Sequence, residues 1–123
     1  MTDARNEATV RIRDDRLVGP VLSRVVGMLA ARANFPVDRL DDALLLTDAI
    51  AAHGPEHRRN DDLQVAVRTG DDGLRVEVGP LREGGAEAML EAAVLPQVGN
   101  VFERIADDVR TEDERLLIHV AAK

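Results

Sequence analysis

Apolar residues recur at a spacing of three and four over residues 16–33, which predicts a helix that buries one face. Asp14 or Asp15 stands where an N-terminal cap is expected. Pro20 falls in the first turn, where the missing N–H is tolerated. We therefore expect a long amphipathic helix near the start of the chain.

A second helix is predicted to follow the Asn-Phe-Pro break at residues 34–36 and to run to about His53. Asp38 is its expected cap, with Asp41 and Asp42 in the first turn beside the positive end of the helix dipole. Its apolar surface is wide, so we expect other elements to cover it on more than one side.

Four segments alternate apolar and polar residues, the pattern of a strand with one buried face. They begin at residue 8, at residue 63, at residue 74 and at residue 115. Residues 69–73 read as a hairpin turn with two glycines for positive φ. Outward strand positions are expected to be polar, as in an antiparallel sheet with one face in water. These positions are Arg11, Arg13, Gln64, Arg68, Arg75, Glu77, Arg115 and His119.

Two short helices are predicted between the central hairpin and the end of the chain. One follows Gly84-Gly85 and stops at Pro96, and the next starts near Val98. A short segment around Val109 then precedes the last strand. The order β-α-α-β-β-α-α-β-β predicts an α+β fold: a two-layer α/β sandwich with a mostly antiparallel sheet and helices on one face. A single domain over residues 1–123 is expected, with residues 1–7 flexible.

Composition and net charge exclude several classes of function. The 123 residues include 2% aromatic residues, too few for stacking on single-stranded nucleic acid, and the net charge of −7 disfavours nucleic acids and anionic membranes. There are no cysteines, which excludes disulfides, thiolate metal sites and cysteine nucleophiles. No signal core or membrane-spanning run is visible, so a cytoplasmic protein is expected. His53 and His57 are four residues apart, but Gly54-Pro55 interrupts their helix and no third ligand lies nearby, so no metal site is expected.

The element order and two segments, residues 39–53 and residues 99–109, resemble the anti-sigma-factor serine kinases of the histidine-kinase-like (Bergerat) ATPase superfamily. The likeness spans residues 8–121, and it implies a histidine-kinase-like ATPase domain. In that family one helix carries a Glu and, four residues later, an Asn. Residues at this spacing share one helix face, so the Glu can polarise the attacking group while the Asn holds Mg²⁺.

The matching positions here are Asp48 and Ala52. Asp48 keeps a carboxylate, whereas the methyl group of Ala52 cannot ligate magnesium, which needs oxygen donors. Asp48 has two readings: a catalytic residue by resemblance, or a structural carboxylate that is either paired or solvated at the rim of the helix. The structural reading is favoured, because ion pairs imitate functional sites.

The family also carries an Asp-x-Gly-x-Gly turn, whose Asp binds the adenine amino group. The stretch here around Gly79 has no Asp at the turn, Pro80 removes a backbone donor, and Glu77 is expected to point to the other face of the sheet. If a nucleotide binds, the candidates for contact with it are Gly79, Gly84, Gly85 and Gly99. A helix cap and a helix-start glycine explain the last three equally well.

Three functions follow. The first is a regulatory protein resembling an anti-sigma factor, which binds a protein partner and has a decayed ATP site. Its partner by resemblance is a sigma factor or an anti-sigma antagonist, and no cofactor is expected. The second is an active serine/threonine kinase using ATP and Mg²⁺. The third is a small dimeric interaction module unrelated to transcription. An apolar surplus on the helices predicts a homodimer or a complex with another protein.

Overall fold

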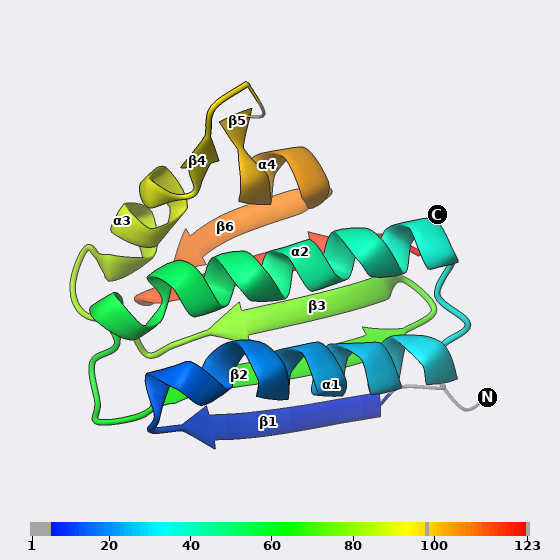
Figure 1. The fold of residues 1–123 in the computed structure, drawn as a ribbon, viewed down its shortest axis with the longest axis horizontal. Coiled ribbons are helices and arrows are strands. Elements are labelled where there is room, and N and C mark those ends of the chain that lie inside the picture. The colour runs from blue at the N-terminus through cyan, green and yellow to red at the C-terminus, as the bar shows by residue number, and fades with distance from the viewer. Residues whose placement is uncertain (1–5, 98, 123) are drawn as a thin grey trace.

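A computed structural model describes residues 6–97 and 99–122 of the protein. Figure 1 shows long helices that lie along one face of a twisted sheet. The elements are β1 (Asn6–Ile12), η1 (Asp15–Leu17), α1 (Val18–Arg32), α2 (Val37–His53), η2 (Pro55–His57), β2 (Leu63–Gly70), β3 (Gly73–Val78), α3 (Gly85–Ala92), β4 (Val94–Leu95), β5 (Gly99–Asn100), α4 (Val101–Ile105), β6 (Asp108–Glu112) and β7 (Arg115–Val120).

The main sheet has five strands in the order β1-β2-β3-β7-β6, and every neighbouring pair is antiparallel. The helices α1 and α2 lie side by side across it (Figure 1). The predicted α+β class, with two layers and helices on one face of an antiparallel sheet, is therefore confirmed. Alternate residues of the central strands are buried beneath the helices, as their sequence pattern predicts.

The core lies between the two layers and is almost entirely aliphatic. Its largest fully buried side chain is Phe102 of α4, and Phe35 closes the end between α1 and α2. Two hydroxyls enter the layer as a linked pair: Ser23 Oγ lies 3.3 Å from Thr47 Oγ1 and donates to the Gly19 carbonyl at 2.8 Å. Thr47 in turn donates to the Leu44 carbonyl at 2.7 Å, so its buried hydroxyl is satisfied.

Both long helices form where their periodicity predicts, but the capping of α2 differs. The prediction that Asp38 caps α2 is wrong: Pro36 occupies the N-cap and Asp38 lies in the first turn. Pro36 has φ −59° and ψ 145°, so the chain turns helical at the very next residue. Asp14 does act as a cap, and its carboxylate accepts the Arg16 N–H at the start of η1.

Three further boundaries depart from the predictions. Asn6 and Glu7 belong to β1, so they are ordered by strand pairing, while residues 1–5 lie outside the described part of the chain. The central hairpin is tighter than expected, since β2 and β3 extend to Gly70 and Gly73. Of these two glycines only Gly73 has a positive φ, at 111°.

The segment between β3 and β6 contains a hairpin that the sequence pattern did not show. A helix was expected from near Val98, which lies outside the described residues, but α4 covers only Val101–Ile105. The two-residue strands β4 and β5 stand between α3 and α4. Asn100 fixes α4 by accepting the Glu103 N–H at 3.1 Å and donating to the Leu90 carbonyl at 2.6 Å.

Candidate functional site

The outer side of α2 carries the two positions that the resemblance singles out. Asp41, Leu45, Asp48 and Ala52 recur at helical spacing and are all exposed, so they form one stripe along the helix. Asp48 and Ala52 are therefore neighbours on one face, as predicted. Within the described residues the Asp48 carboxylate has no hydrogen-bond or ion-pair partner, which matches the solvated form of its structural reading. A molecule that binds to this stripe would meet the carboxylate of Asp48 and the methyl group of Ala52.

The candidate glycines are explained by local backbone geometry. Gly79 and Gly84 have positive φ values of 138° and 74°, and Gly99 has a φ of 89° in the β4–β5 hairpin. Gly84 is the N-cap of α3, and Gly85 begins that helix. A Cβ on Gly85 would lie 3.1 Å from the His57 Cβ, so the close approach to η2 favours glycine there. Turns and close packing thus account for these positions.

Glu77 is the acidic residue nearest to the turn that follows β3. Its side chain lies on the face of the sheet opposite the helices, where Arg115 donates to its Oε2 at 3.2 Å. The expectation that Glu77 points away from the helical layer is confirmed. No carboxylate of the stretch from Val76 to Leu81 therefore turns toward the helices, where the resemblance places an adenine contact.

The face of the sheet that none of the described helices covers, called the open face below, carries a row of charged residues. Strand register places one residue from each of the five strands side by side in this row. The row is Glu7, Arg68, Arg75, His119 and Asp108. Its three central positions are cationic or titratable, and its two ends are acidic.

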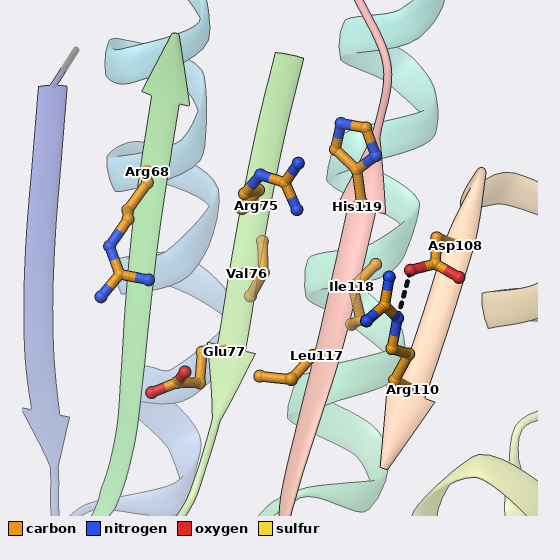
Figure 2. A pocket seen from close by; sticks show the side chains of 9 residues that line it. All are labelled: Arg68, Arg75, Val76, Glu77, Asp108, Arg110, Leu117, Ile118 and His119. Atoms are coloured by element: carbon orange, nitrogen blue, oxygen red, sulfur yellow. Dashed lines mark hydrogen bonds and ion pairs between the residues drawn. The ribbon is translucent and has the colours of Figure 1, made fainter. Parts of the chain in front are cut away.

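Figure 2 looks onto this open face, where the row borders a shallow hollow of about 200 Å³. The side chains of Arg68, Arg75, Arg110 and His119 rise from four different strands around it. The floor is formed by the strands themselves near Val76, Leu117 and Ile118. Guanidinium forks suit carboxylate or phosphate groups, but Glu77 and Asp108 line the same hollow and offset part of its positive charge.

Each arginine of the hollow already has an acidic neighbour. Arg68 donates to Glu7 at 2.6 Å, Arg75 to Asp72 at 2.8 Å and Arg110 to Asp108 at 2.8 Å. The hydrogen bond from Arg75 holds the pKa of Asp72 below its usual range. These pairs are substantially exposed, so each is worth at most about 1 kcal/mol.

Sequence reasoning recognised Arg68, Arg75 and His119 as outward residues but missed the hollow. Arg110 and Asp108 were absent from the outward set, because the predicted order included a strand around Val109 but did not assign its faces. Alternation of Val109 and Thr111 with charged residues was the available signal. The lateral order of strands, which brings β6 beside β7, follows from tertiary packing and not from local pattern.

Other kinds of site were sought in the same described residues. Within residues 6–97 and 99–122, no three His, Asp or Glu side chains gather closely enough to hold a metal ion. None of the described helices combines the length and apolarity that crossing a bilayer requires. Comparison with known proteins identified no matching family and no matching curated protein.

Proposed function

We propose that this chain is a regulatory protein resembling the anti-sigma factors. It forms a homodimer, acts by binding a protein partner and does not use ATP. The observation that carries the proposal is the exposed methyl group of Ala52, one turn from Asp48 on the outer stripe of α2. At this position the family presents an amide oxygen to magnesium. A methyl group supplies no ligand to a hard cation.

The position of Glu77 supports the same proposal. An adenine contact would need a carboxylate at the turn after β3, and Glu77 is engaged with Arg115 on the open face instead. Loss of one charge-assisted contact costs about 1.5–3 kcal/mol. Two losses amount to about 3–6 kcal/mol, or roughly a hundred- to ten-thousand-fold in affinity, which removes micromolar nucleotide binding.

Exposed apolar side chains on the same layer favour a protein as the partner. Leu45 lies in the α2 stripe with 52% of its surface exposed, and Val37 at the start of α2 is 74% exposed. Large apolar groups in water mark surfaces that other proteins cover. By resemblance the partner is a sigma factor or an anti-sigma antagonist. The net charge of −7 disfavours nucleic acid as a partner.

Calorimetric titration with ATP and Mg²⁺ tests the nucleotide part of the proposal. We expect no saturable heat at micromolar concentrations for the natural chain. Ala52→Asn restores the missing amide and is expected to strengthen binding. Ala31→Asn, an exposed alanine on α1, is the matched control and should change nothing. Tight stoichiometric binding by the natural chain would contradict the proposal, and identical titrations of Ala52→Asn and Ala31→Asn would show that the pocket lies elsewhere.

A further inference from the structure

The strand β1 forms one edge of the five-stranded sheet, and its outer side pairs with no strand among the described residues. The Gly79 N–H donates to the Gln64 carbonyl at 3.0 Å, so Gln64 directs its backbone groups toward β3. The N–H and C=O groups of successive residues in a strand point alternately to its two sides. The residues next to Gln64, Leu63 and Val65, therefore direct these groups toward β1. The partners of those residues in β1 are its even-numbered residues. The N–H and C=O groups of Glu7, Thr9 and Arg11 therefore point outward from the free edge.

This edge is complementary to a second copy of itself. When two β1 strands run antiparallel about a two-fold axis at Thr9, Thr9 faces Thr9 of the second copy. Glu7 then lies opposite Arg11 of that copy, and Arg11 opposite its Glu7, so opposite charges meet on the open face. All three outward residues take part in paired backbone hydrogen bonds in this register. A shift of two residues in either direction separates Glu7 from Arg11. The one shift that brings Arg13 opposite Glu7 uses a residue beyond the end of β1.

The flank of α1 above this edge is apolar, and no other element of residues 6–97 and 99–122 covers it. Gly19 and Ser23 face α2: a Cβ on Gly19 would lie 3.6 Å from the Ala51 Cβ, and Ser23 Oγ lies 3.3 Å from Thr47 Oγ1. Residues two positions further along a helix lie about 200° around its axis, so Val21 and Val25 lie on the opposite flank. This flank, called the α1 flank below, is completed by Leu17 and Met28, which are 50% and 54% exposed.

The β1 edge and the α1 flank can both pair with a second copy at the same time. The helix α1 contacts both β1 and β2, so its axis lies between them (Figure 1). A two-fold axis perpendicular to the sheet keeps both copies of α1 on the same face. The two helices are then separated by about two strand spacings, or roughly 10 Å, which is the distance at which packed helices interdigitate. The α1 flanks would cover one another as the β1 edges join.

From these observations we infer that two copies of the chain join edge to edge through β1, in the register centred on Thr9, and bury their α1 flanks against each other. The product is a continuous ten-stranded sheet with helices on one face. The inference rests on the homodimer of the proposed function and adds its surface and register. It requires neither a nucleotide nor the regulatory partner.

Sedimentation equilibrium of the natural chain and its variants tests this assembly. Thr9→Pro removes an N–H that points to solvent in the single chain, so we expect a folded monomer by circular dichroism and at least a hundredfold rise in the dimer Kd. Arg11→Glu places like charges opposite each other twice, and should raise the Kd about tenfold. The charge swap Glu7→Arg with Arg11→Glu should return the Kd to within about threefold of the natural value.

The α1 flank has its own pair of variants. Met28→Lys should raise the dimer Kd about tenfold, whereas Val94→Lys, at an exposed apolar residue of β4, should leave it unchanged. A natural chain that stays monomeric at several hundred micromolar would overturn the inference together with the homodimer of the proposed function. A dimer that tolerates both Thr9→Pro and Arg11→Glu would overturn the β1 surface alone and leave that homodimer standing.

Discussion

Replacement of Phe102 by alanine should release the segment between β3 and β6 from the rest of the protein. Phe102 is fully buried although α4 has only five residues, so packing and not helix propensity keeps α4 in place. α4 packs against α2, the helix that carries Asp48. Truncation of a buried Phe to Ala costs about 3–5 kcal/mol. A chain of this length has a total stability of about 6–18 kcal/mol, so the loss is a large fraction of it.

Urea denaturation followed by circular dichroism gives the free energy of unfolding for the natural chain and for Phe102→Ala. Phe102→Leu is the matched control, and it should cost about 1–2 kcal/mol because it keeps most of the apolar volume. Amide hydrogen exchange should show faster opening in α4 and β5 than in β2 for the alanine variant. A cost below about 1 kcal/mol for Phe102→Ala would refute the packing argument.

Three further predictions concern two arginine ion pairs and the close contact at Gly85. Arg39 donates to the Ala121 carbonyl at 3.1 Å and to Asp107 at 2.7 Å. Arg39→Met should therefore lower the free energy of unfolding in urea by about 1.5–3 kcal/mol. A double-mutant cycle with Asp107→Asn should give a coupling energy of about 0.5–1 kcal/mol. Coupling within error of zero would show that the pair contributes nothing. Arg75→Gln should raise the pKa of Asp72 toward its usual range, as measured by NMR titration of the carboxyl carbon. The folded-state pKa of Asp72 is lowered, so its contribution to stability is present at neutral pH and is lost as the pH falls through that pKa; an unshifted titration in the variant would argue against the ion pair. Gly85→Ala should lower stability by about 1–2 kcal/mol in the same urea assay, because the new Cβ would lie within 3.1 Å of a neighbouring side-chain carbon; an unchanged midpoint would show that η2 gives way freely.

Much of the fold follows from periodicity in the sequence. α1 and α2, the central hairpin and β7 form where apolar spacing predicts them, because each element is long enough to show its period against the core. The misplaced features are short. The two-residue strands β4 and β5 carry no readable period, and the exposed Val94 and Leu95 of β4 show no burial pattern. α2 begins directly after Pro36, because the backbone geometry of this proline outweighs the preference of Asp38 for the N-cap.

The candidate site was predictable in part. The spacing of Asp48 and Ala52 placed both on one face of a helix, since a single regular helix determines their relation. The hollow of the open face was not predictable, because Arg68 and Arg110 line the same hollow only through the lateral order of strands in the sheet. The outward direction of Glu7, Thr9 and Arg11 depends in the same way on which residues of β2 bond to β3.

The most direct test of the account is the affinity for its protein partner, measured with and without ATP and Mg²⁺. The partner is first recovered by affinity purification from the native host and then produced in pure form for an equilibrium titration. We predict the same Kd at zero and at millimolar ATP, because the chain lacks the groups that would couple nucleotide to partner binding. A Kd that changes fivefold or more on addition of ATP and Mg²⁺, and returns when Mg²⁺ is chelated, would contradict the account.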